Sequence, residues 1–129
     1  MFSLYVSHSH SQKYDFKNLL YLPIRNSDLN DLFIIELPHE DTVEPFMFIE
    51  HMKTLTAIIA EVSLSATGQE IELDWASTHE VPIICIHQKG TTPARSLATV
   101  SQHFYEYDGP EDMIAKIKEG LDELGLIPY

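Results

Sequence analysis

Stretches of β-forming apolar residues alternate with stretches of helical periodicity along the whole chain. This alternation restricts the fold more than any other feature. Two of the apolar runs, TAIIAEVS at 56–63 and VPIICIHQ at 81–88, are almost without polar interruption. Such runs are typical of strands in a parallel sheet that helices cover on both faces. Shorter runs at 2–7, 31–37 and 103–108 predict three more strands.

Helical spacing marks the segments between these strands. Phe16, Leu19 and Leu20 predict a helix over residues 13–30, which Pro23 should end or kink. Four further helices are expected at 43–55, 67–80, 92–101 and 109–125.

Two of these expected helices carry clear core-facing residues. In the helix at 67–80, Ile71, Leu73 and Trp75 are expected to point inward. In the helix at 109–125, the buried stripe is expected to consist of Met113, Ile117, Leu121 and Leu124, with Gly125 as a C-cap.

The strand–helix alternation predicts a doubly wound, parallel α/β sheet of about five strands in the order 2-1-3-4-5. The length of 129 residues fits a single domain over 1–129. Ligands of such folds bind at the carboxyl ends of the strands, near the switch in strand order. The turns at 7–12 and 61–70 are therefore the expected site.

Charge and composition exclude several classes of partner. Twenty acidic and eight basic residues give a net charge of −12, which disfavours nucleic-acid polymers and anionic membranes. No apolar run approaches the ~20 residues of a membrane span, and the N-terminus lacks the pattern of a signal peptide. The lone Cys85, expected as a buried small hydrophobe, favours a reducing, cytoplasmic compartment.

Familiar cofactor and catalytic motifs are missing. The GQEIE stretch lacks the glycine spacing of a dinucleotide fingerprint, no Walker lysine follows a glycine loop, and no Gly-x-Ser-x-Gly elbow is present. His8 and His10 lack a third metal ligand at a recognisable spacing. We therefore expect neither a cofactor nor a metal.

Carboxylates surround the turn after the strand at 56–63. Glu61 ends that strand, and Glu72 lies in the first turns of the next helix, where the helix dipole favours its ionised form. An ionised carboxylate can act as the nucleophile of a glycosyl transfer. Acids in first helical turns are also common surface residues, so both interpretations stay open on these grounds.

The same stretch contains a specific pattern. The matching residues are Ala60, Glu61, Val62, Ser63, Gly68, Glu72, Leu73 and Ala76. They resemble the signature of the nucleoside 2-deoxyribosyltransferase superfamily, which includes deoxynucleoside 5′-monophosphate N-glycosidases and runs roughly A-E-V-S/T-x-P-S-x-G-x-G-x-E-L-G-x-A. The resemblance extends through 81–90 and 95–100 to the last strand and helix, and weaker similarity covers residues 4–9.

This resemblance implies a flavodoxin-like fold and the cleavage or exchange of an N-glycosidic bond in two displacements. It places Glu72 at the nucleophile position and Ser96 at the position of a serine donated across a homodimer. The substrate-binding residues that it implies are Tyr5, Ser7, His8, Ser9, His10, Glu61, Ser65, Gly68 and Ser96. His8, His10 or Glu50 is expected to assist departure of the base.

The chain departs from the signature at several positions. Ser65-Ala66 replaces its Pro-Ser pair, Glu70 replaces its second glycine, and Asp74 replaces the glycine after Glu-Leu. Phe48 and Thr56 stand where the family usually has aspartates. Crowding of the carboxylates at 61, 70, 72 and 74 is expected to raise some of their pKa values. A neutral nucleoside or another ribosyl compound therefore fits better than a phosphorylated one.

Two functions remain open at this level. One is an N-glycosidase or deoxyribosyltransferase acting on a small nucleoside or nucleotide. The other is a non-catalytic nucleotide-binding or protein-interaction domain that keeps the fold. In either case, apolar side chains such as Phe46, Phe48 and Trp75 predict a homodimer packed through the helices at 43–55 and 67–80.

Overall fold

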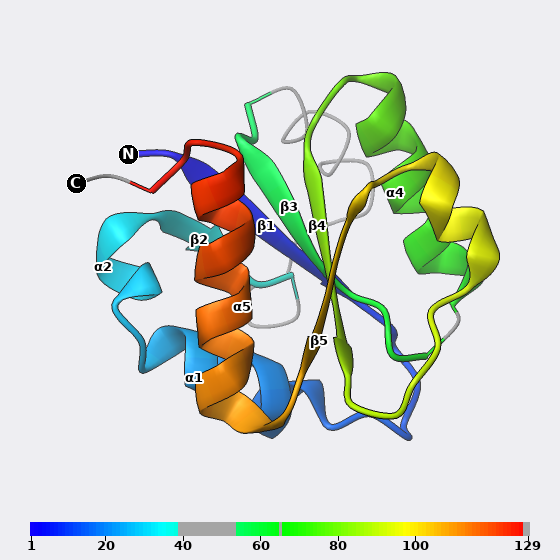
Figure 1. Cartoon of the computed structure of the whole chain (residues 1–129), viewed down its shortest axis with the longest axis horizontal. Helices are drawn as coiled ribbons and strands as arrows, with labels where there is room; N and C mark the ends of the chain where they lie inside the picture. Colours follow the sequence, from blue (N-terminus) through cyan, green and yellow to red (C-terminus); the bar gives the residue numbers. More distant parts are fainter. Residues whose placement is uncertain (39–53, 65, 128–129) are drawn as a thin grey trace.

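A five-stranded, all-parallel sheet forms the centre of the molecule (Figure 1). This computed structural model describes residues 1–38, 54–64 and 66–127. The strands are β1 (Ser3–His8), β2 (Ile34–Glu36), β3 (Ala57–Glu61), β4 (Ile83–Gln88) and β5 (His103–Tyr107). Their order in the sheet is β2-β1-β3-β4-β5, which confirms the predicted doubly wound α/β class.

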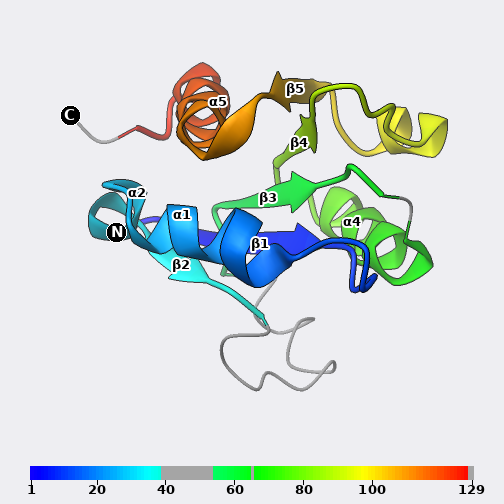
Figure 2. The same ribbon diagram turned by 90° about the horizontal axis from the view of Figure 1, so that it is seen from below.

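Helices cover both faces of this sheet. Helices α1 (Leu22–Arg25), α2 (Leu29–Leu32) and α5 (Gly109–Glu123) lie on one face, and α4 (Thr67–Thr78) lies on the other (Figure 2). Each face therefore has its own hydrophobic core, and side chains of β1 alternate between the two. Leu4 and Val6 belong to the α1/α5 core, whereas Tyr5 belongs to the α4 core. No helix in the described residues has both the length and the apolar character needed to span a membrane.

The helix predicted at 13–30 is divided into shorter pieces. A π-helix, η1 (Lys17–Tyr21), runs directly into α1, and Leu22 N–H bonds to the carbonyl of Lys17. Pro23 then lies in the first turn of α1, where its missing N–H costs little. The helical path therefore continues past Pro23 and does not end there, and the change from π-helix to α-helix falls between Tyr21 and Leu22, where an end or a kink was predicted.

Three other expectations need correction or fall outside the described residues. Leu20 is fully buried as expected, but Leu19 is 45% exposed. The first two residues of the strand predicted at 31–37 belong to helix α2, and β2 has only three residues. Almost all of the helix predicted at 43–55 lies outside the described residues, which resume at 54.

The inward face of α4 differs from the prediction. Leu73 is fully buried, but Ile71 and Trp75 are 47% and 42% exposed. The buried stripe runs instead through Gln69, Leu73 and Ala76, which have the spacing i, i+4, i+7 of one helical face. Gln69 is tolerated there because its side-chain amide donates to the carbonyl of Glu61, at 2.9 Å.

Helix α5 agrees well with its predicted pattern. Met113, Ile117 and Leu121 are buried. Gly125 has a φ of +71° and closes the helix, because its N–H bonds to the Asp122 carbonyl and the next N–H bonds to that of Leu121. Ahead of α5, a short 3₁₀ helix, η2 (Arg95–Thr99), replaces the helix expected at 92–101.

Candidate functional site

Buried polar residues gather at the carboxyl edge of the sheet. The ends of β1 and β3 lie side by side there, with His8 opposite Glu61. Among the described residues, the buried polar side chains are Ser7, His8, Ser9, Glu61 and Gln69. All of them come from these two strand ends or from the turn or helix that follows each. Because burying polar groups is costly, this concentration marks the edge as a candidate site.

Glu72 lies over this edge on the α4 face. It is half-buried on α4, and its carboxyl interacts with the hydroxyls of Ser7 and Tyr5 from β1. Burial raises the pKa of Glu72 from 4.5 to about 7, although both hydroxyls act to lower it. In turn, burial and the neighbouring Glu72 raise the pKa of Tyr5, so Tyr5 stays protonated and can donate a hydrogen bond.

Ser7 has spare hydrogen-bonding capacity. Its side chain is 1% exposed, and Ser7 Oγ has no hydrogen-bond partner of good geometry within the described residues. Its influence on the pKa of Glu72 therefore reflects proximity rather than a well-aligned hydrogen bond. A buried hydroxyl without a firm partner is uncommon in folded proteins, and here it lies beside a carboxylate.

The pKa of Glu72 is raised for a different reason from the one expected. Its largest cause is burial, and neither Glu70 nor Asp74 contributes. Glu70 instead accepts a hydrogen bond from Ser96 at 3.0 Å, and Asp74 is exposed. Glu72 also lies beyond the first turn of α4, which starts at Thr67, so the helix dipole does not keep it ionised as expected.

A second carboxylate, Glu61, lies at the same edge but on the opposite face. It is 2% exposed and accepts hydrogen bonds from Ser63 N–H at 2.7 Å and from the hydroxyl of Tyr107. The Tyr14 hydroxyl lies 3.5 Å from that of Tyr107 and also interacts with Glu61. Burial and Glu61 raise the pKa of both tyrosines, which therefore remain donors.

His8 lies on the Glu61 side of the sheet. Its Nδ1 is 2.9 Å from the carbonyl of Ser9, which can only accept, so Nδ1 carries the proton. In the neutral ring Nε2 then accepts from the hydroxyl of Tyr21, at 2.6 Å. Phe16 stacks on the ring with centroids 4.4 Å apart. His8 thus packs against η1 and its approach, rather than beside Glu72.

The other predicted site residues are dispersed around this edge. Ser9 is buried and its hydroxyl accepts from Ser11 N–H at 3.1 Å, which shapes the turn after β1. His10 is exposed, and its ring lies 5.5 Å from that of His8. Gly68 is in the first turn of α4, with no atom crowding its α-carbon. Ser96 contacts Glu70 of its own chain.

Three residues with predicted roles, Ser65, Phe48 and Glu50, lie outside the described residues. Conversely, the sequence prediction missed Tyr14, Tyr107 and Gln69, which hold Glu61 in place. A signal for Tyr107 was available, since it is the last residue but one of the strand predicted at 103–108 and so had to lie near the carboxyl edge. Within the described residues, no three His, Cys, Asp or Glu side chains are grouped so that they could hold a metal ion.

No protein-family model and no curated protein matches this sequence. Solved structures do match its architecture. The CMP N-glycosidase BcmB of Clostridium botulinum aligns with a TM-score of 0.60 and 20% sequence identity, over 90% of this chain and 98% of BcmB. The chain shares the fold of a CMP N-glycosidase.

A conserved protein from Enterococcus faecalis V583 is equally similar in structure. Its TM-score is also 0.60, with 12% identity, and the alignment covers 92% of this chain and 98% of the other. At such low identities the likeness establishes the fold alone. It nevertheless confirms, at the level of fold, the resemblance that the sequence indicated.

Proposed function

We propose that this protein cleaves or exchanges the N-glycosidic bond of a nucleoside-like compound, with Glu72 as nucleophile. The observation that carries the proposal is the cluster of Glu72, Tyr5 and Ser7 at the carboxyl edge of the sheet. It joins a half-buried carboxylate to one hydroxyl that can donate and one that has no firm partner. The shared fold with a CMP N-glycosidase supports the same chemistry.

The reaction would proceed in two displacements. The ionised carboxylate of Glu72 attacks the anomeric carbon, the bond from carbon to the base nitrogen breaks, and the base leaves with that electron pair and acquires a proton. Water or a second base then attacks the same carbon, loses a proton and releases Glu72 as a carboxylate. Tyr5 would hydrogen-bond the Glu72 carboxylate and hold it in position, and the exposed His10 remains a candidate to assist the leaving base.

We further propose a neutral nucleoside or another uncharged ribosyl compound as substrate. The net charge of −12 disfavours an approaching phosphate and leaves a neutral ligand unaffected. Ser9 and the uncrowded backbone at Gly68 lie along the same edge and would line the ligand.

The decisive experiment is base release by chromatography across matched nucleosides and nucleoside monophosphates. Glu72→Gln should slow release at least about a thousandfold, because an amide cannot form the glycosyl ester. Asp74→Asn is the matched control, since it removes an exposed carboxylate two residues away on the same helix, and it should stay within about twofold of wild type. Equal turnover by wild type and Glu72→Gln would exclude the nucleophile role.

One observation favours the rival function, a binding domain without chemistry. With a pKa of about 7, Glu72 is only about half ionised at neutral pH, whereas a nucleophile must be ionised. If nucleosides bind but neither wild type nor Asp74→Asn releases any base, the binding domain is the correct interpretation.

We also propose a homodimer, in the cytoplasm, packed through the outer face of α4. Ile71 and Trp75 are both exposed there at the helical spacing i, i+4, and Ser96 is attached to the same flank through Glu70. Light scattering should give the dimer mass for wild type and the monomer mass for Trp75→Asp, with the fold checked by circular dichroism. A wild-type monomer at high micromolar concentration would contradict the proposal.

A further inference from the structure

A groove lies between η1, α1 and the start of α5, on the face opposite α4 and Glu72. Its volume is about 550 Å³, which is within the range of small-molecule sites. Gln88 and Tyr107, which end β4 and β5, contribute to its lining. The groove is therefore at the carboxyl edge of the sheet, where ligands of parallel α/β folds bind.

The apolar part of the groove comes from side chains that the fold leaves uncovered. Leu19 and Leu22 are 45% and 52% exposed, and both line the groove. Pro23 follows them, and Pro110 at the start of α5 also lines the groove. Rigid, apolar surfaces of this kind suit a flat ring, whose burial would remove the leucines from water.

The polar part consists mainly of amides. Asn18 and Asn26 come from the helical side, and Gln88 comes from β4. The amide nitrogen of Asn18 donates to Asp15 at 2.8 Å, which leaves the Asn18 carbonyl oxygen as an acceptor. The groove thus offers both donors and acceptors to a ligand with amide-like edges.

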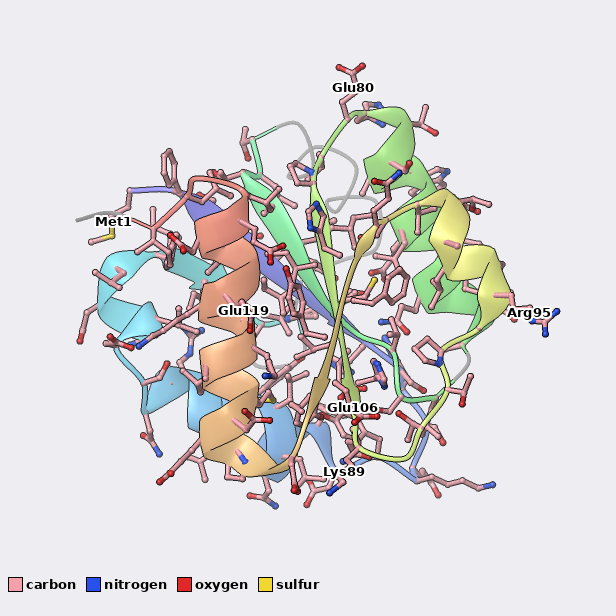
Figure 3. The ribbon with its side chains drawn as sticks, in the orientation of Figure 1. Met1, Glu80, Lys89, Arg95, Glu106 and Glu119 are labelled. Atoms are coloured by element: carbon pink, nitrogen blue, oxygen red, sulfur yellow. The ribbon has the colours of Figure 1, made fainter. Side chains whose placement is uncertain are left out.

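The charges around the groove are already engaged with one another. Lys89 pairs with Asp108 at 3.8 Å, and Asp108 N–H donates to Asp112 at 2.8 Å. Figure 3 shows Lys89 at the carboxyl edge, below the end of β4. No uncompensated cation therefore lines the groove to attract an anion, and the net charge of −12 repels one.

We infer that this groove binds an uncharged, planar nitrogen heterocycle with amide-type donors and acceptors, at a site separate from Glu72. A smaller adjoining hollow of about 340 Å³ shares Pro23, Asn26 and Pro110, so the heterocycle has room for a substituent. The inference does not depend on the proposed glycosidase chemistry, because none of the groove residues belongs to the Glu72 cluster.

The test is a nuclear magnetic resonance titration of the whole chain with nicotinamide, adenine and nicotinate. Nicotinamide and nicotinate have the same ring and differ in carrying a neutral amide or a carboxylate. Nicotinamide and adenine should produce saturable shifts at the side-chain amides of Asn18, Asn26 and Gln88. Nicotinate should bind about tenfold more weakly or not at all.

Variants decide whether the shifts come from the groove. Leu22→Asp places a charge on an exposed wall residue without disturbing the core, and it should weaken nicotinamide and adenine binding about tenfold or more. Ile34→Asp, which changes an equally exposed residue on β2, is the matched control and should bind like wild type. Glu72→Gln should also bind like wild type at the groove.

Three outcomes with these probes and the groove variant would overturn the inference. They are the absence of saturable shifts at the groove amides with both neutral probes, equal affinity for nicotinate, and unchanged affinity in Leu22→Asp. If Glu72→Gln loses binding, the shifts must be attributed to the proposed glycosidase site. This result would also overturn the inference. Failure of Glu72→Gln to affect base release would contradict the proposed function alone.

Discussion

Two carboxylates at the same edge of one sheet have opposite surroundings. Glu61 is fully buried, and a backbone N–H and the hydroxyls of Tyr107 and Tyr14 hold it. Glu72 is only half-buried, and only two hydroxyls, those of Tyr5 and Ser7, lie near its carboxyl. The Ser7 hydroxyl is not aligned for a firm hydrogen bond. The more deeply buried acid is therefore the better satisfied one.

This difference separates a structural carboxylate from a chemically available one. A buried acid with all its acceptor positions occupied contributes to a fixed arrangement of neighbouring elements. Burial destabilises the ionised form of an acid. Where hydrogen bonds do not fully compensate for this cost, the acid remains able to bind a ligand or a proton. On this basis Glu61 positions the turn and α4, whereas Glu72 is the nucleophile that we propose.

The largest expected effect on stability comes from replacing each carboxylate by leucine. Glu61→Leu removes the acceptor from three buried donors and should lower the free energy of unfolding by about 4 kcal/mol. Glu72→Leu removes a poorly compensated charge and should cost less than about 1 kcal/mol at neutral pH. Urea denaturation measures both. Equal losses would break the distinction between the two sites.

The next effect is the pH dependence that Glu72 gives to stability. Its pKa is about 7 in the folded protein against an ordinary value of 4.5, so the folded state binds more protons between these values. The free energy of unfolding should therefore fall as pH rises from 4.5 to 7, by up to about 3 kcal/mol, and Glu72 should add no further dependence above that.

The control for this effect is Glu72→Gln, which has no proton to lose. The difference in stability between this variant and wild type, measured by urea denaturation at several pH values, isolates the contribution of Glu72. Base release by the wild type should rise over the upper part of the same range as the nucleophile ionises. A flat difference curve would show that Glu72 titrates normally.

The smallest effect compares the tyrosines beside the two acids. Tyr107→Phe removes one donor from Glu61 and should lower the free energy of unfolding by about 1–2 kcal/mol. Tyr5→Phe should act on titration instead, raising the pKa of Glu72 further because the Tyr5 hydroxyl lowers it. Carbon-detected titration of the Glu72 carboxyl tests the second effect. An unchanged midpoint in Tyr5→Phe would mean that Tyr5 does not stabilise the ionised form.

The sequence predicted the sheet well because buried strands have a simple signature. The runs around β3 and β4 are continuous and apolar, and the strand–helix alternation leaves few possible topologies. It failed where tertiary packing decides the outcome. The burial of Leu73 rather than Ile71 and Trp75 depends on the rotation of α4 about its axis, which the apolar residues alone left undetermined.

The candidate site was predictable only in part. Strand periodicity puts Tyr5 and Ser7 on one face of β1, and the family resemblance pointed to Glu72. The reason for the raised pKa of Glu72 was not predictable, because burial depends on how closely α4 approaches the sheet. Pairing of Glu61 with Tyr107 brings together residues 46 positions apart and needs the completed sheet.

The alternation of side chains along β1 has an evolutionary consequence. Ser7 and His8 are adjacent in the chain, but Ser7 faces Glu72 whereas His8 packs with Tyr21 on the other side. The sheet thus divides the molecule into two compartments that share a backbone and almost no side chains. Substitutions can accumulate in one compartment without passing through the other. A lineage with this fold can therefore lose a reaction on one side while selection maintains a ligand on the other.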